Sequence, residues 1–152
     1  MFSPNLLKVF DPANPETDRA HRHFYAYAKC FNFVAKSSRP EKEPQLDVGN
    51  AAFALLGRNP RFYAPWDLNC GIHPVDRSAD FLYAAYSGNN RVMIVALNDS
   101  DKSVTRVLEI DPEKLRLPQN NGKDVFNQQE YKVEGNRLIL ELPPRESRFI
   151  MF

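Results

Sequence analysis

The sequence predicts a mainly β fold: an antiparallel β-sandwich of about seven strands preceded by an N-terminal helical segment. Two observations predict the sheet. Short stretches rich in β-branched and aromatic residues recur in the second half of the chain, and turn residues that tolerate a positive φ angle separate them. A third observation, apolar residues at intervals of three and four before position 36, predicts the helix. We therefore divide the chain into a helical segment at 1–44 and a β-sandwich domain at 45–152.

The first expected element is a helix from Glu16 to Lys36. Asn14, Pro15 and Glu16 form a typical helix start, because a capping side chain, a proline and an acidic group suit its unpaired backbone amides. A single apolar stripe along this helix predicts the face through which it is buried. The stripe consists of Ala20, Phe24, Tyr27, Ala28, Phe31, Val34 and Ala35.

A second, shorter helix is expected from about Val48 to Leu56. Asp47 would be its N-cap and Gly57 its C-terminal stop. The segment 58–78 follows, with three prolines, an aromatic cluster and no clear period. These features predict a long aromatic loop that is packed by its own side chains.

Seven strands are expected after this loop, and two turns that contain Gly and Asn predict two hairpins among them. These turns lie at 87–90 and 134–136. The strand at 91–97 is apolar on both faces, which indicates a central position, whereas alternation along 137–142 indicates one exposed face. The expected strands are Phe81–Tyr86, Arg91–Leu97, Val104–Ile110, Val125–Phe126, Glu130–Val133, Arg137–Leu142 and Arg148–Met151.

Composition argues against several classes of partner. Lys and Arg total 20 against 19 Asp and Glu, and no basic run interleaves with aromatic residues, so no nucleic-acid partner is expected. The apolar runs are far shorter than the ~20 residues of a membrane helix, so no membrane partner is expected either. Cys30 and Cys70 have no metal-binding spacing and are interpreted as thiols. His21 and His23 point in different directions on a helix, so neither a metal nor a cofactor is expected.

Three features in chain order carry a resemblance to a known family. The strand at 91–97 runs into Asn98 and a polar turn, the segments 124–127 and 130–133 follow, and a Leu-Pro-Pro step within 135–144 precedes a closing strand. Residues 80–152 thereby resemble the C-terminal β-sandwich of α-amylase-type glycoside hydrolases. In that family the sandwich follows a catalytic barrel, so the resemblance implies that the helix at 16–36 could correspond to the end of such a barrel. The family's catalytic carboxylates lie on the barrel, and the resemblance assigns no catalytic residue here.

The resemblance implies a non-catalytic accessory domain that supports the catalytic domain of the same parent chain. A secreted or periplasmic location follows if that parent enzyme carries a signal peptide. The alternative is a carbohydrate-binding module for a polysaccharide, in which aromatic faces stack on pyranose rings and polar neighbours meet the hydroxyls. The candidate residues for that platform are Phe62, Tyr63, Trp66, Asp67 and Asn69. The same rings could instead pack the loop onto the sandwich.

Two further patterns have simpler explanations. A small enzyme could use the 58–78 loop as an active-site rim, with Asp67 and His73 as its reacting groups, but the spacing of Cys70 and His73 matches no known catalytic motif. Asn98 begins an Asn-Asp-Ser sequence that matches a glycosylation acceptor. We interpret this sequence as a turn whose side chains bond to the backbone.

Overall fold

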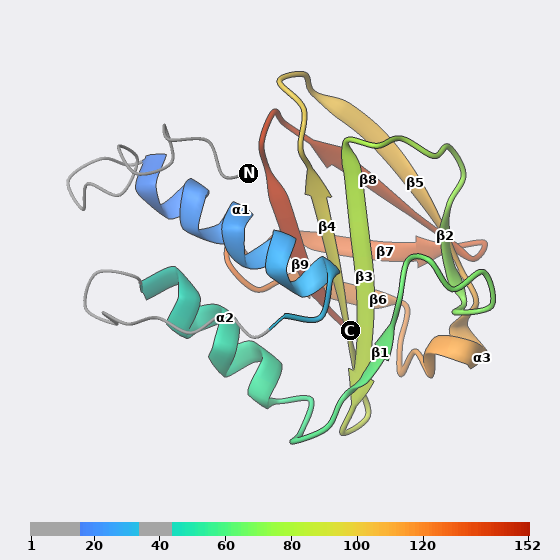
Figure 1. Cartoon of the computed structure of the whole chain (residues 1–152). Helices are drawn as coiled ribbons and strands as arrows, with labels where there is room; N and C mark the ends of the chain where they lie inside the picture. The colour runs from blue at the N-terminus through green and yellow to red at the C-terminus, as the bar shows by residue number, and fades with distance from the viewer. Residues whose placement is uncertain (1–15, 34–43) are drawn as a thin grey trace.

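The computed structural model of the protein describes residues 16–33 and 44–152. Nine antiparallel strands form one nearly closed sheet, and two helices, α1 (Glu16–Cys30) and α2 (Pro44–Ala54), lie on one side of it (Figure 1). A mainly β fold is therefore confirmed, with nine strands in place of the seven expected. No helix in the described ranges is long and apolar enough to cross a membrane. The strands are β1 (Arg61–Tyr63), β2 (Ile72–Pro74), β3 (Phe81–Gly88), β4 (Arg91–Asn98), β5 (Val104–Ile110), β6 (Asn121–Asp124), β7 (Glu130–Glu134), β8 (Arg137–Leu142) and β9 (Ser147–Met151).

The two additional strands lie at the edges of the sheet. The spatial order is β1-β3-β4-β9-β6-β7-β8-β5-β2, so the chain segment at 64–71 joins one edge strand to the other. The prediction of an irregular loop throughout 58–78 is wrong at β1 and β2. Three-residue strands leave no period in the sequence, and these two form only because they pair with β3 and β5.

Both predicted hairpins are confirmed. Gly88 pairs with Arg91 in the β3–β4 hairpin, and Glu134 pairs with Arg137 in the β7–β8 hairpin. Asn and Gly fill the turns with positive φ angles, as two-residue hairpin turns require. The short strand predicted at 125–126 is wrong: β6 lies just before it, and these residues belong to a turn.

The sheet folds over so that its two halves face each other across an inner core. β4 is buried on both faces and β8 on alternate residues, as predicted for both strands. A second core lies between the helices and the outer face of β3, β4 and β9. The inner core includes Ile94, Leu108, Leu138, Leu140 and Ile150, and the second includes Tyr25, Phe53, Tyr86, Val95 and Phe149.

The described part of α1 ends earlier than predicted. After Cys30, Asn32 adopts a left-handed φ of 58°, its amide donates to the Lys29 carbonyl, and the Phe33 amide donates to the Ala28 carbonyl. This pair of bonds is a Schellman motif, which ends a helix with a residue in the left-handed conformation. The predicted continuation at 34–36 and the predicted start at Asn14 and Pro15 lie outside the described residues.

The buried face of α1 also differs from the predicted stripe. Phe24 and Tyr27 are each 40% exposed, whereas Tyr25 is fully buried, stacked on Phe149 with centroids 5.4 Å apart. His21 is buried as well. Apolar residues occupy two sides of this helix, so helical periodicity alone could not identify the side that the sheet and α2 would cover.

Helix α2 runs from Pro44 to Ala54, four residues earlier at its start than predicted, so that Asp47 lies in the first turn and is not the cap. Gly57 follows it with a φ of 89°, which confirms the predicted stop. Gly49 permits close packing on α1, because a Cβ there would lie 2.4 Å from the Tyr25 ring. A third helix, α3 (Pro112–Leu115), was not predicted, although Asp111 caps it with two hydrogen bonds to backbone amides.

Asn98 ends β4 and confirms the interpretation of its sequence as a turn. Its side-chain amide donates to the carbonyls of Lys102 and Pro143 at 2.7 and 2.9 Å, and its side-chain oxygen accepts from the hydroxyl of Ser100 at 2.8 Å. The side chain is buried. It therefore connects the turn after β4 to the chain that leaves β8.

Candidate functional site

The most distinctive surface feature in the described residues is a group of aromatic side chains at the end of α1. Phe31 and Phe33 belong to the turn that closes this helix, Phe62 lies on β1, and Trp66 follows β1 in the link between the sheet edges. We call this group, made of Tyr27, Phe31, Phe33, Phe62 and Trp66, the aromatic surface.

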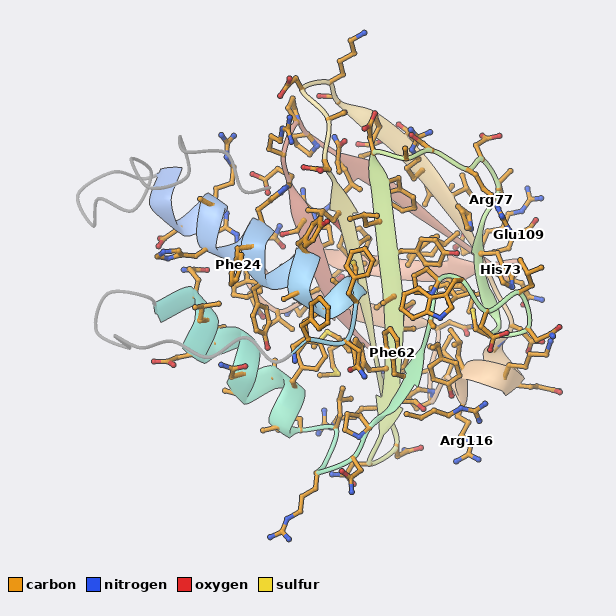
Figure 2. All side chains as sticks on the ribbon, viewed as in Figure 1. Phe24, Phe62, His73, Arg77, Glu109 and Arg116 are labelled. Atoms are coloured by element: carbon orange, nitrogen blue, oxygen red, sulfur yellow. The ribbon has the colours of Figure 1, made fainter. Side chains whose placement is uncertain are left out.

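The five rings form a continuous series of contacts. Phe31 is central: its ring centroid lies 6.3 Å from that of Trp66, 6.3 Å from that of Phe33 and 5.2 Å from that of Tyr27. Trp66 also meets Phe62 edge-on at 5.9 Å. Phe62, labelled in Figure 2, has its ring centroid 5.1 Å from that of the core residue Tyr86, and this contact anchors the aromatic surface to the helix-facing core.

Much of this surface faces solvent. Trp66 is 62% exposed and Phe33 is 63% exposed, and the neighbouring Leu68 is also exposed. Single exposed apolar residues are ordinary, whereas a contiguous group of large exposed rings is a candidate interaction surface.

The structure brings only part of the predicted carbohydrate platform to this surface. Phe62 and Trp66 belong to it, whereas Tyr63, which points to the other side of β1, is 2% exposed. The Tyr63 hydroxyl lies 2.9 Å from the Ser87 hydroxyl and donates to the Lys114 carbonyl at 3.0 Å. Tyr63 is thus a core residue, because successive side chains alternate across a strand.

Asp67 and Asn69, the predicted polar partners of a sugar, are both exposed beside Trp66. An Asp67 carboxylate oxygen accepts a hydrogen bond from the Asn69 amide at 2.9 Å, and the Asp67 carbonyl accepts from the Cys70 amide at 3.1 Å. These two bonds form a turn directly after Trp66, which itself lies in a turn closed by the Asp67 amide donating to the Ala64 carbonyl at 3.0 Å.

Tyr27, Phe31 and Phe33 were not predicted as site residues. The helical period places Tyr27 and Phe31 in the predicted buried stripe, and it assigns no role to Phe33. The sequence feature that indicates the end of the helix is Asn32, which lies between Phe31 and Phe33. Asparagine readily takes the left-handed conformation that ends a helix. Ending the helix there leaves both rings outside its regular packing.

The groups considered for a small enzyme do not form a catalytic arrangement among the described residues, because Asp67 and Cys70 each bond to the backbone. The Cys70 thiol donates to the Ile72 carbonyl at 3.3 Å, and burial raises its pKa, which disfavours the reactive thiolate. His73 lies opposite Glu109 in the β2–β5 pair (Figure 2), and Glu109 pairs with Arg137 at 3.4 Å. All three residues line a surface hollow of about 520 Å³. Among the described residues, no three His, Cys, Asp or Glu side chains gather as metal ligands.

No family model matches this sequence, and no curated protein matches it. Its structure is similar to solved glycoside hydrolases. A family 27 β-L-arabinopyranosidase from Geobacillus stearothermophilus superposes with a TM-score of 0.55 at 12% identity, over 88% of this chain and 30% of that one. An Anoxybacillus α-amylase superposes with a TM-score of 0.53 at 8% identity, over 88% of this chain and 32% of that one.

A maltogenic α-amylase from Thermotoga neapolitana is similar with a TM-score of 0.50 at 14% identity, over 79% of this chain and 28% of that one. The chain thus spans about a third of the length of the glycoside hydrolases it matches. At such identities the similarity establishes the fold, which is related to that of glycoside hydrolases.

Proposed function

We propose that this chain is a non-catalytic accessory domain of a glycoside hydrolase, and that it supports the catalytic barrel of the same parent chain by docking through the aromatic surface. The observation that carries this proposal is the exposure of Phe33 and Trp66 in a group of rings anchored to the core. The matched glycoside hydrolases are about three times as long as this chain, so each has room for a second domain. In the same proposal the helix within residues 1–44 is the packing helix beside the end of the barrel, so the rings it carries lie where the barrel would meet the sandwich.

Docking would supply a substantial driving force. Full burial of one large apolar side chain contributes about 1.5–3 kcal/mol. Tyr27, Phe33 and Trp66 are each at least 40% exposed, so covering them together would contribute several kcal/mol by the same scale. A covalently linked barrel also loses little translational freedom on docking, because linkage gives it a high effective concentration.

The test uses this chain and the parent enzyme's barrel as two separate polypeptides in a calorimetric titration. We expect saturable binding that Trp66→Ser and Phe33→Ser each weaken at least tenfold. Ile139→Ser is the matched control, because Ile139 is 60% exposed on β8, outside the aromatic surface. Absence of binding, or an equal loss in the control, would contradict the proposal.

Trp66 favours a second candidate function, carbohydrate binding. Its indole is 62% exposed, and exposed Asp67 and Asn69 follow it closely in the chain. One face of the indole lies beside Phe31, so a pyranose ring would stack on the other. Polysaccharide would then be the partner.

Trp66 is the only tryptophan, so its fluorescence reports directly on sugar binding. We would titrate the protein with soluble glucans, galactans, xylans and mannans, with Trp66→Phe as the control for tyrosine emission. A saturable change restricted to the wild-type protein supports carbohydrate binding. No response across the panel, in a protein that melts cooperatively, rejects it.

A further inference from the structure

A second surface feature lies away from the aromatic surface and is independent of the function proposed above. A hollow of about 410 Å³ opens between the start of β1, the β3–β4 hairpin and the residue that follows α3. Its lining includes Arg61, Arg91 and Arg116, one from each of these places (Figure 2 labels Arg116). We call it the arginine hollow.

The three arginines of this hollow lack anionic partners among the described residues, which distinguishes them from the paired arginines at 137, 145 and 148. Arg137 pairs with Glu109, Arg145 with two aspartates and Arg148 with Glu146. By contrast, no carboxylate in the described ranges lies within ion-pair distance of the three arginines of the hollow. No Asp or Glu is among the described residues that line it. The hollow therefore concentrates positive charge on a chain whose formal net charge is only +1.

Each of the three arginines is positioned by a contact of its own, through the guanidinium for Arg61 and through the backbone for Arg91 and Arg116. The Arg61 guanidinium lies 5.0 Å from the centroid of the Tyr63 ring, and that ring is fixed by its own hydrogen bonds. Arg91 is paired with Gly88 at the β3–β4 turn. Arg116 caps α3, with its amide donating to the Glu113 carbonyl at 3.1 Å.

Arg116 also occupies an unusual backbone conformation. Its φ is 57°, in the left-handed region that favours glycine or asparagine. A long cationic side chain at that position has a conformational cost, and it places a third positive charge at the rim of the hollow. Asn59 and Asn90 line the same hollow and add amide donors.

We infer that the arginine hollow binds a phosphate group. A guanidinium presents a planar set of N–H donors that matches two phosphate oxygens, and three of them can neutralise a dianion. Repulsion among the arginines is relieved when that dianion binds. The volume exceeds that of inorganic phosphate and lies within the range of small-molecule sites, so either free phosphate or the phosphate ester of a sugar could supply the group.

The experiment is a calorimetric titration at low ionic strength with inorganic phosphate, glucose 6-phosphate and glucose. We expect saturable binding of the phosphate-bearing probes and none of glucose. Tighter binding of the ester would identify a sugar phosphate as the ligand, whereas equal binding would identify phosphate itself. The affinity should also fall as salt increases.

Arg91→Gln and Arg116→Asn should each lower the affinity at least tenfold, and asparagine keeps the left-handed backbone accessible at position 116. Arg137→Gln is the matched control, because it removes the same charge from an exposed arginine outside the hollow, and it should change the affinity less than twofold. Thermal melts of all three variants check that they fold. Lack of saturable binding, unchanged affinity in both hollow variants, or an equal loss in the control would overturn the inference.

Discussion

Phe31 and Trp66 stack with ring centroids 6.3 Å apart and an angle of 22° between their planes. Phe31 closes the helix α1, whereas Trp66 lies in the link between the two edges of the sheet. Their contact therefore joins the helical layer to the gap where the sheet does not close. The aromatic surface exists only because both segments reach this place.

This contact predicts a measurable coupling. Phe31→Ala and Trp66→Ala, alone and together, should give a double-mutant coupling energy of about 0.5–1.5 kcal/mol, as for other aromatic pairs. The measurement is the free energy of unfolding in urea. The pair Phe31→Ala and Ile139→Ala is the control and should be additive. Additivity of Phe31 and Trp66 would contradict the stacked geometry.

Asn98 should be highly sensitive to substitution. Its side-chain amide faces the carbonyls of Lys102, Leu142 and Pro143, so Asn98→Asp would place a buried carboxylate against three oxygens. We expect the free energy of unfolding to fall by at least about 3 kcal/mol for Asn98→Asp and by about 2 kcal/mol for Asn98→Ala. Urea denaturation measures both losses.

The control for Asn98 is Asn120→Asp, the same change at an exposed position, which should shift stability by about 0.5 kcal/mol or less. If Asn98→Asp were tolerated as well as the control, the buried hydrogen-bond arrangement would be wrong.

Asp124 should stabilise the turn after β6 and its contact with β9. One carboxylate oxygen accepts from the amides of Phe126 and Asn127 at 2.8 and 2.9 Å, and the other accepts from the Phe149 amide at 2.9 Å. Asp124→Asn replaces one carboxylate oxygen with an NH2 group, which would face a backbone N–H. We therefore expect the free energy of unfolding to fall by about 2–3 kcal/mol. Asp67→Asn keeps an oxygen that can accept from the Asn69 amide, so it should lower the free energy of unfolding far less. Equal midpoints of thermal unfolding for the two variants would argue against this role.

Stability should fall at alkaline pH. Burial raises the pKa of Cys30 and of the phenols of Tyr25 and Tyr86. The folded state therefore keeps these protons after the unfolded chain begins to release them, at about pH 8.5 for the thiol and about pH 10 for the phenols. Above each of these values the unfolded state binds fewer protons, so the free energy of unfolding decreases by up to about 1.4 kcal/mol per pH unit for each group.

Lys29 opposes this trend, because burial lowers its pKa and the folded state loses that proton first. Its effect ends near pH 10.4, where the unfolded lysine also deprotonates. Tyr86→Phe removes one of the buried phenols and should make the alkaline decrease shallower. Urea denaturation between pH 8 and 11 measures the slopes, and identical slopes for this variant and the wild-type protein would contradict the prediction.

The sequence predicted elements whose signals are local. The apolar run of β4, the alternation along β8, the Asn and Gly turns of both hairpins and Gly57 after α2 each depend on a few adjacent residues. The sequence could not predict β1 and β2, because a strand of three residues is too short to show an alternation of apolar and polar side chains. Of the aromatic residues in the candidate platform, Phe62 and Trp66 share a surface, while Tyr63 is buried.

Local chemistry was therefore enough to establish from the sequence a mainly β protein with helices before its sheet. Only the tertiary structure determined which face of α1 is buried. It also brought the two edge strands of the sheet close enough for residues 64–71 to join them, and it assembled the aromatic surface and the arginine hollow. The physical reason is that turns and helix caps form their hydrogen bonds with residues nearby in the chain. Core packing and surface clusters instead depend on contacts between residues far apart in sequence. Phe31 meets Trp66, and Arg61 shares a hollow with Arg116, only after the sheet has formed.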